Sequence, residues 1–375
     1  MALSKKQIFG SALLILIFLG LTYFIIGKIQ YRMNVMDVEE YKPISTLKVP
    51  QHILKRAKYP FIDVHNHQWT MPIQNLDNLI KEMDSLNMQV MVNLSGFRGK
   101  FLEWSLDNVK ENYPKRFIIF MNINFENLDD EGWPNETLQM MENAVKQGAN
   151  GLKVYKGLGL TDVDNEGKRI AVNDPRLDPI WAKCGELGIP VLIHSGEPNS
   201  FWNPKDKYNE RWLELKQEPG RFRDPAKVPS FEDIMAEQHS VFQKHPNTKF
   251  IDAHLGWFGN DLERLGKLFD AMPNVYTELG AVLAELGRQP KAARAFMIKY
   301  QDRIMFGKDT YKMEEYYTYF RVLETGDEYF DYYRKRHAHW KMYGLELPDS
   351  VLRKVYYKNA LHVIPGIDPA PFDLK

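Results

Sequence analysis

The sequence predicts an α/β protein, a (β/α)8 TIM barrel preceded by one N-terminal transmembrane helix. Two observations predict the barrel: eight short apolar runs follow one another from about residue 60 onward, and a helical pattern or a long loop follows each run. Parallel strands that alternate with helices are typical of this fold. A third observation, the uncharged apolar segment 8–26, predicts the helix. With 375 residues, 44% of them hydrophobic, the chain can bury a complete core.

The apolar segment 8–26 is long enough to cross a bilayer, because about 1.5 Å per residue brings it close to the ~30 Å hydrocarbon thickness. The alternative is a cleaved signal peptide, whose apolar core is normally shorter and ends in small residues. Here the run leaves through Ile25-Ile26-Gly27-Lys28, so we expect an uncleaved anchor over residues 1–27. A short basic N-terminus usually stays inside, which predicts a membrane protein whose main domain is extracytoplasmic.

After the anchor we expect a tether and arm (28–57), the barrel domain (58–366) and a C-terminal tail (367–375). The expected strands are residues 61–65, 89–95, 117–124, 151–155, 190–194, 249–254, 274–280 and 303–307. A doubly wound open sheet is the alternative, but no glycine-rich phosphate loop follows any of these runs. The connection from Ser195 to about Phe231 is unusually long, which predicts a lid over the catalytic face or else a surface insertion.

The charge balance and the single cysteine exclude several classes of function. Lys+Arg and Asp+Glu both number 49, so a nucleic-acid partner has no electrostatic support. Cys184 alone cannot form an intrachain disulfide or a cysteine-rich zinc site. The partners we expect are a small-molecule substrate, the membrane through the N-terminal helix, and a second copy of the chain in a homodimer.

The segment FIDVHNH, residues 61–67, carries the first metal-binding pattern. Side chains alternate along a strand, so Asp63, His65 and His67 share one side, and Ile62 and Val64 take the other. Two imidazoles at positions i and i+2 converge on a single ion. Three later strand ends add His194, His254 and Asp309, and we expect the set to hold one divalent metal with a position left for water.

Two other polar features need separate interpretation. His337 and His339 form another H-x-H pattern, but its context looks helical, where residues two apart point to nearly opposite faces, so we predict a structural or surface role rather than metal binding. Alternation places Lys153 inside the barrel. It could face a substrate carboxylate, pair with Asp63 or Asp309, or be carboxylated to bridge a second metal, and a structural ion pair is an equal alternative.

These motifs resemble the amidohydrolase superfamily, in particular the branch of aminocarboxymuconate-semialdehyde decarboxylase and the dicarboxylate lactonases. The resemblance covers roughly residues 50–366 and is carried by FIDVHNH, DPRLDPIWAKCGELGIPVLIHSGEP, HPNTKFIDAHLGW, RIMFGKDT and KVYYKNALHVI. It implies a distorted TIM barrel with His65, His67, His194 and Asp309 as metal ligands, and His254 in catalysis. Lys308 departs from the family pattern, in which a small or hydroxyl residue is more usual.

The expected reaction is hydrolysis of an amide, ester or lactone by metal-activated water, with Asp309 and His254 as the catalytic residues. Zinc is the expected metal, and manganese accepts the same ligands. A non-oxidative decarboxylase is the second prediction, and a catalytically silent, membrane-tethered binding protein is the third. Residues that follow strands on the catalytic face, and that could contact substrate or support the site as Lys153 could, are Trp69, Arg98, Tyr155, Trp202 and Trp257.

Overall fold

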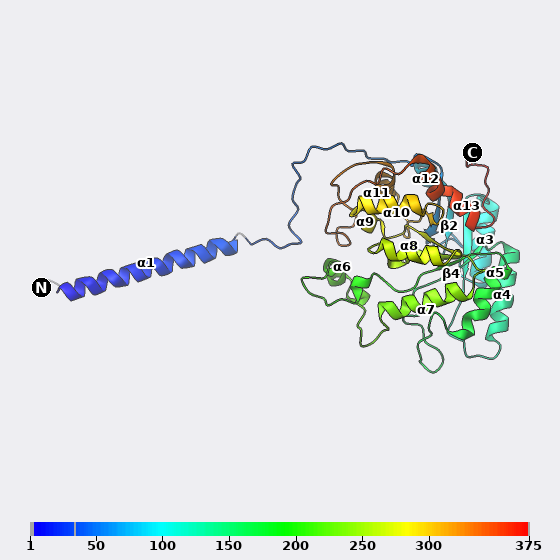
Figure 1. The fold of residues 1–375 in the computed structure, drawn as a ribbon, viewed down its shortest axis with the longest axis horizontal. Coiled ribbons are helices and arrows are strands. Elements are labelled where there is room, and N and C mark those ends of the chain that lie inside the picture. Colours follow the sequence, from blue (N-terminus) through cyan, green and yellow to red (C-terminus); the bar gives the residue numbers. More distant parts are fainter. Residues whose placement is uncertain (1–3, 34, 374–375) are drawn as a thin grey trace. The chain divides into compact units, whose positions relative to one another are not determined.

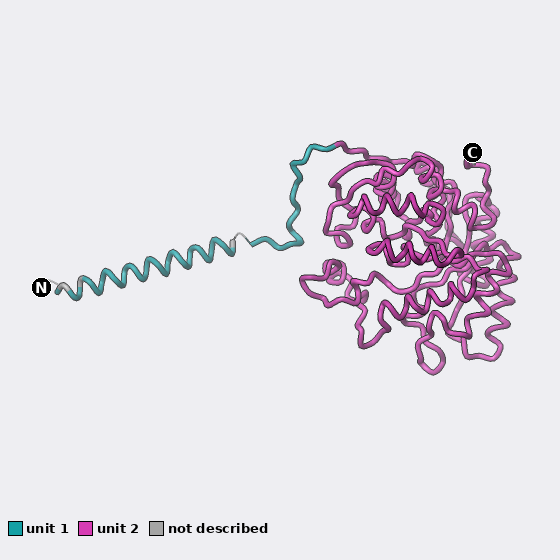
Figure 2. The backbone as a smooth tube through the Cα atoms, viewed as in Figure 1, with its two compact units in different colours: residues 1–49 teal, residues 50–375 magenta. Residues whose placement is uncertain are grey.

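The computed structural model describes residues 4–33 and 35–373. The chain forms two compact units, residues 1–49 and residues 50–375 (Figure 2). The first unit contains helix α1 (Lys5–Met33), whose segment Phe9–Arg32 is long and apolar enough to cross a membrane. The apolar side chains of this segment are exposed, as expected of a helix that is not packed into a protein core.

The second unit is a barrel of eight parallel strands in chain order, with helices around the outside (Figure 1). The strands are β1 (Phe61–Asn66), β2 (Met88–Asn93), β3 (Phe117–Asn122), β4 (Gly151–Val154), β5 (Val191–Ile193), β6 (Phe250–Asp252), β7 (Val275–Glu278) and β8 (Ile304–Met305). Each strand overlaps one of the eight predicted runs, so the predicted barrel is confirmed. Because β8 is short, it meets β1 through single contacts: the Val64 amide donates to the Phe306 carbonyl at 2.9 Å, and Asn66 forms a bridge with Asp309.

Amphipathic helices cover the strands because each buries one apolar stripe against the sheet. The longer ones are α2 (Asp77–Leu86), α3 (Gly99–Asn112), α4 (Trp133–Gln147), α5 (Asp178–Glu186), α7 (Phe231–Lys244), α8 (Leu262–Ala271), α10 (Pro290–Lys299) and α11 (Met313–Glu324). Shorter helices are α6 (Trp212–Gln217), α9 (Leu283–Gly287), α12 (Asp349–Arg353) and α13 (Asn359–Val363). The single cysteine, Cys184, is buried in α5.

The helical context predicted for His337 and His339 is wrong. Residues 325–348 form a loop without a helix, held by a bridge between Phe330 and Met342. His337 is buried in this loop, 3.4 Å from the Glu214 carboxylate. The tyrosines and histidines gave a helix-like spacing, but tertiary contacts of the loop override that local pattern.

Candidate metal centre

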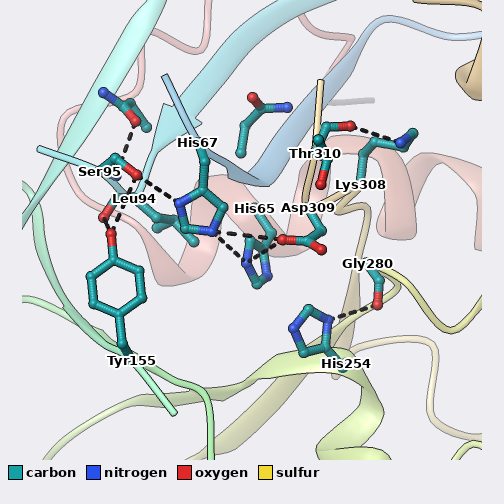
Figure 3. Close-up of polar contacts among 12 residues, drawn as sticks. His65, His67, Leu94, Ser95, Tyr155, His254, Gly280, Lys308, Asp309 and Thr310 are labelled. Atoms are coloured by element: carbon teal, nitrogen blue, oxygen red, sulfur yellow. Dashed lines mark hydrogen bonds and ion pairs between the residues drawn. The ribbon is translucent and has the colours of Figure 1, made fainter. Parts of the chain in front are cut away.

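The site lies at the ends of β1, β6 and β7 and in the loop after β8, where His65, His67, His254 and Asp309 converge (Figure 3). His65 is fully buried. Its Nδ1 lies 2.8 Å from the Glu278 carboxylate, which can only accept, so Nδ1 carries the proton and Nε2 presents a lone pair. This Nε2 lies 3.3 Å from Nε2 of His67.

Asp309 faces both of these imidazoles. Its Oδ1 lies 3.6 Å from Nε2 of His65 and 3.6 Å from Nε2 of His67. The Asp309 amide donates to the His65 carbonyl at 2.7 Å, which fixes the aspartate across the barrel seam. Its φ of 81° lies in the left-handed region, which Asp tolerates better than most residues. The chain therefore accepts backbone strain where it positions this carboxylate.

His254 is positioned by a left-handed turn after β6. The φ angles of His254, Leu255, Gly256 and Trp257 are 60°, 56°, 57° and 59°, and three of these residues are not glycine. Each such residue costs roughly 1–2 kcal/mol, so the surrounding contacts must hold the turn. His254 Nδ1 donates to the Gly280 carbonyl at 2.8 Å (Figure 3), which leaves Nε2 with the lone pair. A ligand atom from each of His65, His254 and Asp309 lies within 4.8 Å of the others.

Glu278, at the end of β7, accepts hydrogen bonds from both His65 and His254. The fully buried carboxylate accepts from His65 Nδ1, from the His254 amide at 2.7 Å and from the Gly280 amide. Burial alone would raise the pKa of Glu278, but the neighbouring His65 and His254 and their hydrogen bonds lower it to about 2. The carboxylate is therefore ionised and can hold both rings in fixed orientations.

His194 supplies an unpartnered imidazole next to this group. Its Nε2 is buried and has no hydrogen-bond partner among the described residues, and its ring packs edge-on against His254 at 4.5 Å. A buried polar atom without a partner is costly, and a bound cation would satisfy it. The donor set of neutral nitrogens and one carboxylate fits a divalent metal of the zinc or manganese type.

The protonation states agree with metal binding. Burial lowers the pKa of His67 to about 2 and that of His254 to about 4, and it lowers the pKa of His194 well below its ordinary value. These three rings are therefore neutral at pH 7, the form that binds metal. Burial opposes ionisation of Asp309, yet the imidazoles of His65 and His254 bring its pKa below the ordinary value.

Lys153 in β4 is the unexpected charge of the site. It is 1% exposed, and its Nζ has no hydrogen-bond partner among the described residues. Burial lowers the pKa of Lys153 to about 7, against the attraction of Glu278 and Asp309. Asp63 instead accepts hydrogen bonds from Tyr316, at 2.6 Å, and from Asn66. Neither of the predicted ion pairs of Lys153 forms a hydrogen bond here.

The predicted lining residues divide into two groups. Trp69 stacks on His67 at 5.6 Å, Tyr155 stacks on His67 at 5.9 Å, and Trp257 packs against His254 at 4.6 Å. These three rings border the imidazoles. Trp202 instead donates to the Pro229 carbonyl at 2.9 Å and packs in the long loop after β5, and Arg98 lies exposed at the start of α3.

Sequence reasoning missed Glu278 and Ser95, whose hydroxyl lies 2.7 Å from His67 Nδ1. An acidic residue at the end of the apolar seventh strand was an available signal for Glu278, whereas a serine after a strand is too common to indicate a role. Lys308 does not enter the site. Its amine donates to the Thr310 carbonyl at 2.7 Å and to Glu315, on the other side of the Asp309 backbone (Figure 3).

Gly307 leaves the space that Glu278 and His65 occupy. A Cβ at this position would overlap the Glu278 carboxylate and lie 3.0 Å from the His65 Cβ. We expect Gly307→Ala to lower both the melting temperature and the affinity for divalent metal, because the overpacked carboxylate must move away from His65. Gly220→Ala is the matched control, since a Cβ there meets open space. Differential scanning fluorimetry with and without added zinc measures both effects. Equal metal affinity in the two variants would contradict this role of Gly307.

Comparisons with known proteins agree with the barrel fold. A family profile described as amidohydrolase matches residues 102–365. No curated protein matches. Among solved structures, an uncharacterized TIM-barrel protein from Bordetella bronchiseptica is similar at 16% identity, with a TM-score of 0.53 over 81% of this chain and 97% of that one. A 2,6-dihydroxybenzoate decarboxylase is similar at 13% identity, with a TM-score of 0.52 over 81% of this chain and 99% of that one. At these identities the two structures show a shared fold.

Proposed function

The chain belongs to the amidohydrolase family, and we propose that it is a metal-dependent hydrolase acting on an amide, ester or lactone bond of a small, carboxylate-bearing substrate. Members of this superfamily bind a divalent metal. The observation that carries the proposal is the convergence of His65, His67, His254 and Asp309 beside the unpartnered His194. We propose zinc as the ion, with manganese as the alternative, held by His65, His67, His194 and Asp309.

The chain's own residues divide the remaining work. When bound, a divalent ion supplies Lewis acidity and lowers the pKa of a coordinated water to about 7. Asp309, ionised at neutral pH and 29% exposed at its side chain, would accept a proton from the attacking water at a carboxylate oxygen. His254, with its proton held at Nδ1 by the Gly280 carbonyl, offers Nε2 as the second acid–base group.

The buried Lys153 is the reason for proposing a substrate that carries a carboxylate. The buried amine has no hydrogen-bonded anion to offset its desolvation, and a substrate carboxylate or a developing oxyanion would supply one. A non-oxidative decarboxylase is the second candidate, because a similar structure is a decarboxylase and the same cation could hold the departing carboxylate. The two proposals differ in product.

The test uses the purified full chain, its metal content determined by mass spectrometry, and a panel of amides, esters, lactones and aromatic carboxylic acids. We expect zinc or manganese near one equivalent and turnover of a lactone, ester or amide without release of CO2. Release of CO2 from an aromatic acid would favour the decarboxylase. A metal-loaded chain that turns over none of the panel would favour the catalytically silent binding protein.

Lys153→Met is expected to stabilise the protein at neutral pH while weakening carboxylate binding. The folded-state pKa of about 7 lies below the unfolded value of ~10.4, so the unfolded chain binds more protons between these values and stability rises with pH. Removing the amine should therefore raise the free energy of unfolding at pH 7 by on the order of 2–4 kcal/mol. That gain should shrink as the pH approaches 10.

Denaturant unfolding at pH 7 and pH 9 measures this change, with the exposed Lys146→Met as control. A loss of stability in Lys153→Met at pH 7 would show that the amine has an anionic partner in the resting protein. The proposed carboxylate specificity would then lose its support.

We also propose that α1 is a single-pass membrane anchor with the barrel on the extracytoplasmic side. Its support is the length and apolar character of Phe9–Arg32, together with the residues Ile25 to Lys28, which do not form a small-residue cleavage site. A signal peptide is the alternative. The mass of the mature protein, measured from membranes of the producing cell, distinguishes an intact N-terminus from a cleaved one.

A further inference from the structure

A row of aromatic side chains leads from the proposed metal centre to the protein surface. Trp69, which stacks on His67, lies 6.0 Å from Phe97; Phe97 lies 5.7 Å from Phe101, and Phe101 lies 5.4 Å from Trp104, measured between ring centroids. Ile73 and Trp104 line the same surface groove between α3 and the loop after β1. We call Trp69, Ile73, Phe97, Phe101 and Trp104 the aromatic ridge.

The aromatic ridge gathers half of the large hydrophobic side chains that the described residues of the barrel unit expose. Within residues 50–373, eight large hydrophobic side chains are exposed, and four of them belong to the ridge: Trp69 (56%), Ile73 (85%), Phe101 (56%) and Trp104 (48%). The other four come from separate segments, at positions 53, 163, 208 and 329. Contiguous exposed apolar patches mark interaction surfaces, whereas scattered ones do not.

The ridge is held rigidly in its exposed position. The Asn108 side chain of α3 donates to the carbonyls of Met71, at 2.7 Å, and Gln74, at 3.0 Å, and so fixes the loop after β1 against the helix. Exposed Arg98 and Lys100 flank Phe97 and Phe101 along the chain. Trp and Phe next to basic residues is the composition that proteins place at the headgroup level of a bilayer.

We propose that the aromatic ridge rests on the surface of the lipid bilayer, so that the mouth of the metal centre faces the membrane. The inference rests on the proposed anchoring by α1. The barrel is attached to the chain at His52, whose amide donates to Asp327 at 2.6 Å, so about 18 residues separate that point from the end of α1. Extended, they reach roughly 60 Å. A barrel of this size is about 50 Å across, so the tether permits any of its faces to meet the membrane.

Contact of the ridge with lipid also defines a class of substrate. Trp69 of the ridge stacks on His67, and the side chains of His67 and Asp309 are 15% and 29% exposed, so the site opens beside the ridge. Lys153 adds a buried amine inside the barrel. An amphiphile with an apolar body and a carboxylate end, entering from the headgroup layer, matches both features.

The test places an environment-sensitive fluorophore at single cysteines of the full chain in phosphatidylcholine nanodiscs that contain spin-labelled phosphatidylcholine. The native Cys184 is fully buried, which protects it from labelling. The ridge positions are Ile73→Cys and Trp104→Cys. Leu19→Cys in α1 reports insertion of the anchor, and Lys267→Cys, exposed on α8, is the control outside the ridge.

We expect the lipid quencher to reduce emission at Ile73→Cys and Trp104→Cys at least twofold more than at Lys267→Cys, with a blue shift at the two ridge positions and none at Lys267→Cys. Quenching at Leu19→Cys without quenching at the ridge would overturn the proposal while the anchor stands. Quenching at the ridge but not at Leu19→Cys would leave the ridge supported and the anchor contradicted. Ridge labels shielded from aqueous iodide but not quenched by lipid would show that protein covers the ridge, and would also overturn the proposal.

Discussion

Replacing Asp309 with asparagine is expected to abolish binding of divalent metal and to reduce turnover by at least the ~10²–10⁴-fold that a positioned acid–base group contributes. The carboxylate lies 3.6 Å from Nε2 of both His65 and His67, which makes it the anionic member of the proposed ligand set. The amide of asparagine keeps the shape of the side chain but not its charge. Both effects therefore report the loss of the carboxylate.

Asparagine is the suitable replacement because of the backbone. Asp309 has a φ of 81°, and Asn is among the few residues that tolerate the left-handed region, whereas alanine would add strain there. The variant should therefore stay folded. Metal content and the zinc-dependent rise in melting temperature measure the effect, since a ligand that binds only the native state raises apparent stability. Asp349→Asn, a surface carboxylate paired with Lys58, is the control. A fully loaded Asp309→Asn protein would exclude Asp309 from the ligand set.

The barrel was predictable because its signal is repeated eight times along the chain. Short apolar runs such as 117–124 and 274–280 are bounded by helical patterns, and no single wrong boundary changes the topology that they imply together. The loop at 325–348 carries one local pattern only, and tertiary contacts decided its conformation. The direction of the Lys308 side chain could not be predicted for a similar reason. Its amine donates to Thr310 and Glu315, which lie after the last strand, where strand alternation gives no information on position.

The candidate site was predictable as a set of residues but not as a geometry. Alternation in β1 and the position of strand ends indicated His65, His67, His194, His254 and Asp309. The left-handed turn that positions His254 left no signal, because three of its four residues are not glycine. The carboxylate that orients His65 lies 213 residues further along the chain, and a single sequence does not reveal such a pair. The hydrogen-bond partner of each imidazole is decided by which strands the closed barrel brings together.

Glu278→Gln is expected to lower the affinity for divalent metal by about 10–100-fold, although Glu278 need not contact the ion. As a carboxylate, Glu278 only accepts, and it therefore fixes the proton of His65 at Nδ1 and leaves Nε2 with the lone pair that we propose binds the metal. A glutamine amide has a donor end. Because the amides of His254 and Gly280 also donate toward this position, the glutamine cannot satisfy all three donors at once.

Two outcomes follow from that mismatch, and they separate orientation of the ligand from simple stability. If the glutamine directs its NH2 group at His65, the ring must change tautomer and its Nε2 gains a proton, which removes a proposed metal ligand, and the His254 amide, which donates to the same carboxylate oxygen, also loses its acceptor. If it directs the NH2 group at a backbone amide instead, a buried donor is left unsatisfied, at a cost of about 1–3 kcal/mol. Isothermal titration with zinc and the melting temperature of the metal-free protein measure the two effects.

Glu324→Gln is the control. The Glu324 carboxylate lies outside the candidate site and accepts a hydrogen bond from the Tyr356 hydroxyl at 2.6 Å, so its replacement should change stability without changing zinc affinity. If Glu278→Gln behaved as Glu324→Gln does, Glu278 would stabilise the barrel without orienting a ligand. The 2.8 Å contact with His65 and the depressed pKa of Glu278 favour a loss of zinc affinity in Glu278→Gln.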